Sequence, residues 1–177
     1  SKLGAQRLSP RWCVGSIAVR RLDCVGDDAN DVFAHTQMRH DRTHKRSIGG
    51  DHAVTYPVVR AYEERLNVVH FDAHMDYRPF VHGVQWANGN PIRNVSQLKI
   101  CHHIIQVGIR SLRTAQSDVQ DSRARGNDIV TVPDFHRRGV AAIVDRLPKN
   151  EPVYVSIDID VLDMPLVPGC SSSEVNG

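Results

Sequence analysis

Two short stretches of this chain carry acidic residues and histidines at alternate positions. They read His70-Phe71-Asp72-Ala73-His74-Met75-Asp76 and Ser156-Ile157-Asp158-Ile159-Asp160. Because side chains alternate across an extended chain, Asp72, His74 and Asp76 are expected to share one face. Asp158 and Asp160 are expected to share a face for the same reason. Four crowded carboxylates repel one another and stay partly protonated unless a cation lies among them. Two divalent ions would balance the four negative charges, so these residues predict a two-metal site.

The expected ligands combine four carboxylates with two imidazoles. A sixth ligand, His52, follows a glycine turn, Gly49-Gly50-Asp51, at the start of a predicted helix. The full predicted set is His52, Asp72, His74, Asp76, Asp158 and Asp160. Oxygen-rich sites suit magnesium or manganese, and added imidazole favours manganese or a later metal. A pair of ions roughly 3.5–4 Å apart can hold a water between them and lower its pKa towards neutrality, which favours hydrolysis as the reaction class.

The elements that must position these ligands follow from the apolar pattern. Strands are predicted at 67–73, 103–109, 128–132 and 152–158, with a short early strand between 17 and 25. Helices are predicted from the apolar spacing at 54–66 and 140–147, a solvated helix within 110–126, and a loop or weak helix at 31–46. Strands that alternate with helices predict an α/β fold, a mainly parallel sheet between two helical layers. Both acidic stretches close a strand, and open α/β sheets bind ligands at the carboxyl ends of their strands.

Length and composition exclude several classes of protein. A chain of 177 residues fits a single domain, 1–177. The net charge is only +2 and no basic stripe interleaves with aromatics, so nucleic acid is not an expected partner. No apolar run approaches the ~18 residues of a membrane-spanning helix, so no membrane association is expected. The four cysteines are scattered, which predicts free thiols in a reducing cytoplasm.

Three stretches in order resemble the signatures of the ureohydrolase family, which includes arginase, agmatinase, guanidino-acid hydrolases and formimidoylglutamase. They are 49–52, 70–76 and 156–163, and weaker matches at 4–11, 89–93 and 106–110 extend the resemblance over nearly the whole chain. The form of the stretch at 70–74 is most similar to agmatinase-like members. The resemblance implies an arginase-like three-layer αβα fold, here a partial domain shortened at both ends.

The same resemblance implies what the ligands do. One manganese ion would be held by His52, Asp72, Asp76 and Asp158, and a second by Asp72, His74, Asp158 and Asp160. The two Mn²⁺ ions would serve hydrolysis of a C–N bond in a small linear guanidine or amidine, such as agmatine, which gives urea and an amine. The resemblance also implies a homo-oligomer, a trimer or hexamer.

The chain departs from the family at positions that matter for catalysis. Where the family places a proton-shuttling histidine, this chain has Asn88, and an amide cannot exchange a proton near neutral pH. Protonation of the leaving group would then require His82 or a water to substitute for that histidine. The family's acidic clamp for the guanidinium lies beyond the second motif. The nearest candidate here is Glu174, which is expected to be exposed and only structural. The isolated chain is therefore expected to bind manganese and to hydrolyse guanidines poorly.

These departures leave alternatives. A catalytically impaired paralogue with a structural or regulatory role is favoured by Asn88 and by the altered turn at 164–174. A formimidoylglutamase or guanidino-acid hydrolase is a further alternative, because Asp76-Tyr77-Arg78 resembles that branch. A deacetylase of the wider arginase-like fold would use one zinc ion, and the set of six ligands argues against it.

Overall fold

The computed structural model describes residues 12–18, 37–40 and 45–177. The described strands form a seven-stranded sheet in the order β2-β3-β1-β7-β4-β5-β6. Their bounds are β1 Trp12–Ala18, β2 Gln37–His40, β3 Lys45–Gly49, β4 Leu66–Phe71, β5 Cys101–Ile109, β6 Asp128–Thr131 and β7 Val153–Asp158. All neighbouring strands pair in parallel except β2, which runs antiparallel to β3 at one edge. The predicted parallel sheet is confirmed.

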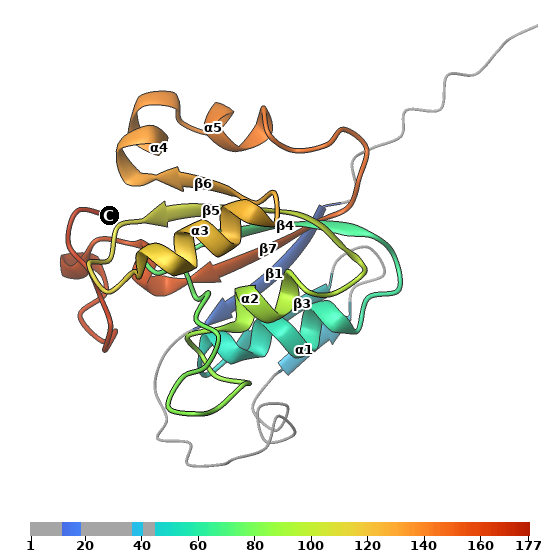
Figure 1. Ribbon diagram of the computed structural model, residues 1–177, viewed down its shortest axis with the longest axis horizontal. Helices are drawn as coiled ribbons and strands as arrows, with labels where there is room; N and C mark the ends of the chain where they lie inside the picture. Colours follow the sequence, from blue (N-terminus) through green and yellow to red (C-terminus); the bar gives the residue numbers. More distant parts are fainter. Residues whose placement is uncertain (1–11, 19–36, 41–44) are drawn as a thin grey trace, which may run out of the picture.

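Helices cover both faces of this sheet (Figure 1). The described α-helices are α1 Thr55–Arg60, α2 Pro91–Val95, α3 Gln116–Ala124, α4 Val132–Arg138 and α5 Ala141–Val144. Short 3₁₀ helices lie at η2 His52–Val54, η3 Ile159–Val161 and η4 Met164–Leu166. In Figure 1, α4 and α5 lie on the opposite side of the sheet from α1 and α2. The predicted three-layer αβα architecture is therefore confirmed.

The core consists of two clusters, one on each face of the sheet. Val68 of β4 and Ile104 of β5 belong to the cluster that includes residues of α1 and α2. The next residues along the same strands, Val69 and Ile105, belong to the cluster that contains Ile143 of α5. Because both faces are covered, successive residues of each strand are buried, which explains the unbroken apolar runs in the sequence.

Two predictions for the first quarter of the chain need correction. The early strand begins before the predicted start, at Trp12, and its predicted continuation at 19–25 lies outside the described residues, as does the weak match at 4–11. The stretch 31–46, predicted as a loop or weak helix, instead contains β2 and the start of β3. These strands form the antiparallel edge of the sheet, where polar residues are common, so the apolar pattern that identifies central strands is missing.

The helix predictions are right in place but too long. Helix α1 ends at Arg60, and Leu66, expected on the same helix, begins β4. The helix predicted at 140–147 is the single turn α5, in which Ile143 is buried; Val144 and the preceding Val140, the N-cap, are 52% and 65% exposed. Helices α2 and α4 were not predicted as separate elements. Each has a proline in its first turn, where it is tolerated, and neither is long enough to show a helical period.

None of the helices in the described part of the chain is long and apolar enough to cross a membrane. Cys101 and Cys170, the cysteines whose side chains the structure describes, are both free, as predicted. Burial raises the pKa of the Cys101 thiol to about 12, so this thiol is unreactive.

Gly108, near the end of β5, allows three segments to meet beneath the acidic stretches. Its φ is +95°, and a Cβ atom there would lie 2.7 Å from Val161 Cγ2 and 3.1 Å from the backbone oxygen of Asp72. The adjacent Val107 oxygen accepts a hydrogen bond from the Asp72 backbone N–H at 3.0 Å. Only glycine permits both the backbone conformation and the close approach.

Gly108→Ala is therefore expected to be among the more destabilising single changes in this chain. A non-glycine residue at this φ costs about 1–3 kcal/mol, and the overpacking adds about 1–3 kcal/mol. Urea unfolding with a fitted midpoint measures the loss. Gly126→Ala is the matched control, because Gly126 has a φ of +81° with nothing within 4 Å of the added Cβ. Equal losses for the two variants would show that the close approach at Gly108 contributes nothing.

Candidate metal centre

The two acidic stretches emerge side by side because their strands are neighbours. Strands β4 and β7 pair in parallel, with His70 opposite Ser156 and Phe71 opposite Ile157. The next residues, Asp72 and Asp158, therefore leave the same edge of the sheet together. His52 reaches this edge from the 3₁₀ turn η2, where the Asp51 side chain caps the turn by accepting from the Ala53 N–H at 2.8 Å.

The ligands lie in curled segments, and not along extended strands as predicted. Strand β4 ends at Phe71, and Asp72 begins an irregular segment in which Asp76 has a φ of +48°. Strand β7 ends at Asp158, and Asp160 lies in the 3₁₀ turn η3. The Asp160 N–H donates to Asp158 Oδ1 at 3.1 Å, which closes this turn. Tight turns, and not strand alternation, bring these side chains to one place.

His52 is the centre of the first group of candidate ligands. Its Nδ1 lies 2.9 Å from Asp72 Oδ2 and 2.9 Å from Asp76 Oδ2. Asp158 Oδ2 lies further away, 3.5 Å from the same nitrogen. On the other side of the ring, Nε2 lies 2.8 Å from Ser156 Oγ. His52 is thus held by Ser156 with its Nδ1 facing three carboxylates.

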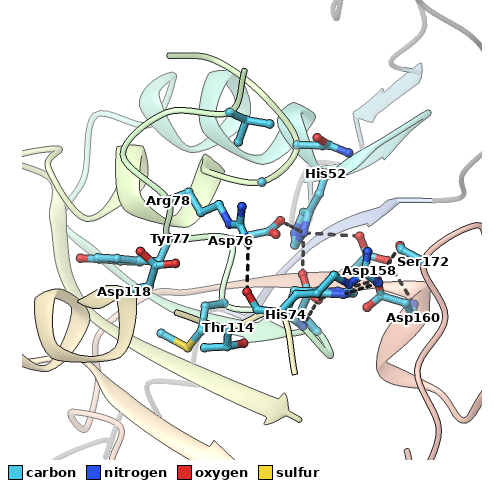
Figure 2. Close-up of a pocket in the computed structure, with 16 residues that line it drawn as sticks. His52, His74, Asp76, Tyr77, Arg78, Thr114, Asp118, Asp158, Asp160 and Ser172 are labelled. Carbon is cyan, nitrogen blue, oxygen red and sulfur yellow. Dashed lines mark hydrogen bonds and ion pairs between the residues drawn. The ribbon is translucent and has the colours of Figure 1, made fainter. Parts of the chain in front are cut away.

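His74 is the centre of the second group. Its Nδ1 lies 3.0 Å from Asp160 Oδ2 and 3.3 Å from Asp72 Oδ1. Asp160 is held in place by the backbone N–H of Ala73, 3.1 Å from Oδ1, and by Ser172, whose hydroxyl donates to Oδ2 at 3.1 Å. Figure 2 shows His74, Asp158, Asp160 and Ser172 gathered on one side of the pocket, with His52 above them.

Asp72 connects the two groups. Its Oδ2 faces His52 and its Oδ1 faces His74, so each oxygen serves a different group. In each of two sets the ligand atoms lie within 4.8 Å of one another: His52, His70, Asp72 and Asp76 form one set, and Asp72, His74 and Asp160 form the other. Asp72 is only 1% exposed and belongs to both sets, which is the geometry that a bridging carboxylate needs.

Burial and crowding shift the pKa values of these groups. Burial raises the pKa of Asp158 to about 7, and repulsion from Asp72 and Asp160 acts in the same direction, against the attraction of His52. Burial and then repulsion from Asp72 raise the pKa of Asp76. Burial disfavours the charged form of His74, but its bonds to Asp160 and Asp72 raise its pKa to about 10. Burial and mutual repulsion thus disfavour the ionised forms of Asp76 and Asp158 when no cation lies between the carboxylates.

The donor set fits a pair of divalent cations. Cations between the carboxylates would offset the repulsion that raises the pKa values of Asp76 and Asp158. Four carboxylates and two imidazoles lining one pocket form a hard, oxygen-rich set with two nitrogen donors. No cysteine lines this pocket in the described part of the chain, so a thiolate zinc site has no support.

Two buried residues of this centre were missed by the sequence analysis. His70 is fully buried, and its Nε2 lies 3.0 Å from Asp72 Oδ2. Among the described residues, no hydrogen-bond partner reaches its Nδ1. Ser156, also fully buried, contacts His52. The signal was available, because His70 and Ser156 each precede an acidic residue by two positions and therefore share its face of the strand.

Asn88 and His82, the residues considered for proton transfer, lie in different surroundings. Asn88 lines the pocket, which has a volume of about 240 Å³, whereas His82 is exposed and is not among the described residues that line it. Val81 and Val84 pair through two backbone hydrogen bonds of 3.0 and 2.8 Å, so His82 lies at the tip of a tight turn with a φ of +49°. The role of Asn88 stays a prediction, and the geometry gives His82 no support as a proton donor.

Glu174 does not lie where the sequence predicted. Its side chain is only 23% exposed, and Oε1 lies 3.3 Å from His74 Nε2. The same oxygen accepts hydrogen bonds from Ser111 Oγ at 2.7 Å and from Arg113 Nη2 at 3.2 Å. The expectation of an exposed residue was wrong, because the turn after β7 folds back over the end of β5.

Comparison with known proteins places this geometry in a family. The model of the arginase family matches residues 20–177. The chain is 35% identical over 138 residues to proclavaminate amidinohydrolase of Streptomyces clavuligerus, covering 73% of this chain and 44% of that protein. It is 30% identical over 169 residues to formimidoylglutamase of Halalkalibacterium halodurans, covering 89% and 53%. The chain therefore spans about half the length of these curated relatives.

A solved structure shares the fold described above. The crystal structure of formimidoylglutamase from Bacillus subtilis superposes with a TM-score of 0.69 at 29% identity, covering 76% of this chain and 45% of that one. The sequence match, the fold and the arrangement of the acidic stretches agree with one another. The chain belongs to the arginase family.

Proposed function

We propose that this protein hydrolyses a C–N bond in a small linear guanidine or amidine and depends on two divalent metal ions, with manganese preferred. The observation that carries the proposal is the double role of Asp72, whose two oxygens face two separate groups of ligands. His52, Asp72, Asp76 and Asp158 would hold one ion, and Asp72, His74, Asp158 and Asp160 the other. When bound, such a pair activates water and polarises the substrate.

The protein's own residues would orient both the ligands and the substrate. Ser156 fixes the ring of His52, and Ser172 and the Ala73 N–H fix the carboxylate of Asp160. Because these supports are buried or partly buried, the ligands are held in one arrangement before substrate binds. Asn88, Thr114 and Asp118 line the same pocket as the ligands, so they would contact a substrate bound beside the metal ions.

The far side of the pocket favours an acidic substrate over agmatine, which the sequence resemblance had suggested. Figure 2 shows Arg78 and Asp118 on this side, away from His74, whereas Arg113, which also lines the pocket, lies close to His74 with Nη2 3.4 Å from its Nε2. Arg78 Nη2 donates to the backbone oxygen of Arg113 at 3.0 Å, which holds the Arg78 guanidinium at the edge of the pocket. Burial raises the pKa of Asp118 and the charges of Arg78 and Arg93 oppose this shift, so its carboxylate already has cationic neighbours where an ammonium group would have to bind. Arginine pairs well with carboxylates, so a guanidino acid or formimidoylglutamate fits better than agmatine.

A substrate panel tests the proposal. The purified protein, with and without added Mn²⁺, would be assayed for urea release from agmatine, guanidinopropionate and guanidinobutyrate, and for formamide release from formimidoylglutamate. We expect metal-dependent release that is faster with the acids than with agmatine. Arg78→Gln should raise KM for the acids about 10- to 100-fold, which corresponds to one lost charged hydrogen bond. Arg137→Gln, which removes an exposed arginine on α4, is the matched control.

Each other outcome has a defined meaning. Preference for agmatine would restore the agmatinase-like interpretation and overturn the role given to Arg78. No release from any substrate, with two ions bound per chain, would favour the impaired paralogue with a structural or regulatory role.

A further inference from the structure

The side chain of Glu174 lies against the outer edge of His74. Glu174 Oε1 is 3.3 Å from His74 Nε2. The opposite ring nitrogen, Nδ1, faces Asp160 Oδ2 and Asp72 Oδ1. The imidazole therefore lies between the acidic centre on one side and a single further carboxylate on the other.

This carboxylate is held in place by the fold. Its Oε1 accepts from Ser111 Oγ at 2.7 Å, which fixes the end of the side chain. The backbone oxygen of Glu174 accepts from Met164 N at 3.2 Å and from Arg110 Nη2 at 3.1 Å. The guanidinium of Arg110 also donates to the backbone oxygens of Asp160 at 2.9 Å and of Val175 at 2.9 Å. Arg110 thus fastens the turn that carries Glu174 to the turn that carries Asp160.

The chemistry of the two groups at His74 Nε2 differs. Arg113 Nη2 lies 3.4 Å from this nitrogen, but arginine can only donate, which would leave the ring proton on Nδ1. A carboxylate can only accept, so Glu174 requires the proton on Nε2 and leaves the Nδ1 lone pair free. The Arg113 side chain is 62% exposed, whereas Glu174 is 23% exposed and bonded to Ser111, so Glu174 is the better-ordered partner.

We propose that Glu174 is a positioning residue for His74. It accepts a hydrogen bond from the Nε2–H group, which selects the tautomer with an unprotonated Nδ1 facing Asp72 and Asp160, and it fixes the plane of the ring. The inference rests on the proposed function, in which His74 serves one of two metal ions. Outer carboxylates of this kind set the orientation and basicity of metal-binding histidines, and their loss costs about 10- to 100-fold in metal affinity.

The test compares Glu174→Met with Glu174→Gln. Methionine keeps the length of the side chain but cannot replace the carboxylate as an acceptor, whereas the glutamine carbonyl still accepts as a neutral group. Calorimetric titration with Mn²⁺ should resolve two binding events in the wild-type protein. In Glu174→Met one of them should weaken by about 10- to 100-fold, and the other should stay unchanged. Glu174→Gln should fall between the wild type and Glu174→Met.

Two further variants separate positioning from general damage. Ser111→Ala loosens Glu174 without removing a group from His74, so it should weaken the same event to a smaller extent. Glu151→Met is the matched control, because Glu151 Oε2 lies 2.6 Å from His102 Nδ1 in a glutamate–histidine pair outside the pocket lining. It should leave both binding events unchanged. The melting temperature of each metal-free variant is measured alongside.

The outcomes distinguish this inference from the proposed function. Wild-type affinity for both ions in Glu174→Met would overturn the positioning role, as would an equal weakening of both events together with a fall in the metal-free melting temperature. A wild-type protein that binds no Mn²⁺ would overturn the proposed function itself. Selective weakening of one event, with partial rescue by glutamine, supports the positioning role.

Discussion

Asp72→Asn is expected to remove both metal ions and almost all activity. The carboxylate of Asp72 is buried and faces His52 with one oxygen and His74 with the other, so neither group of ligands is complete without it. An amide keeps the shape and loses the charge. Losing several kcal/mol of charge stabilisation corresponds to at least about a 1,000-fold fall in turnover. Metal content by elemental analysis and turnover of the best substrate are the measurements.

Variants at the other acidic positions show which carboxylates bridge the two metal ions. Asp158→Asn should behave like Asp72→Asn, whereas Asp160→Asn should spare one ion, because Asp160 contacts the His74 group alone. Asp145→Asn, which changes an exposed carboxylate paired with Arg138, is the control and should keep both ions. Two bound ions in Asp158→Asn would show that Asp158 is not a bridge.

Asn88→His is expected to raise turnover if delivery of a proton to the leaving group limits the rate. Asn88 lines the same pocket as the metal ligands, and an imidazole there can exchange a proton near neutral pH, which an amide cannot. General acid–base catalysis contributes roughly 100- to 10,000-fold, so even partial gain is measurable. Turnover and bound metal would be determined together, so that a change in metal content is not mistaken for proton transfer.

Two control variants define what that result means. Asn88→Gln keeps an amide and should not raise turnover. His82→Asn should leave turnover unchanged, because His82 is exposed at the tip of a tight turn. A loss of activity in His82→Asn would contradict this account and make His82 the proton donor. Unchanged turnover in Asn88→His, with both ions bound, would show that another group already delivers the proton.

The sequence by itself determined the central part of the fold and the members of the acidic centre. The strands β4, β5, β6 and β7 were predicted within two residues at each end. The signal is strongest in β4 and β5, because a strand buried on both faces has a continuous apolar run in its sequence. The four acidic candidate ligands were identified because a buried carboxylate after such a run is costly without a partner, and His52 and His74 were added from their positions beside them. Both signals are local, so they can be read from the order of residues.

Neither signal identifies the peripheral elements β2, β3 and α5. Strands β2 and β3 pair at the edge of the sheet, and their sequences, Gln37–His40 and Lys45–Gly49, contain no continuous apolar run. Helix α5 is a single turn, and only Ala142 and Ile143 in it are buried. Elements with so few buried residues carry too short a pattern to be distinguished from loops.

Only the tertiary structure decided how the site is assembled. Asp76 and Asp160 reach the centre through turns, one at a φ of +48° and one closed by the Asp158 side chain, and the alternation of a strand would have directed them differently. Glu174 contacts His74 although 100 residues separate them in the chain, because Arg110 and Ser111 at the end of β5 hold its turn in place. Contacts of this kind depend on the path of loops, and that path is set by hydrogen bonds between distant segments that no local pattern records.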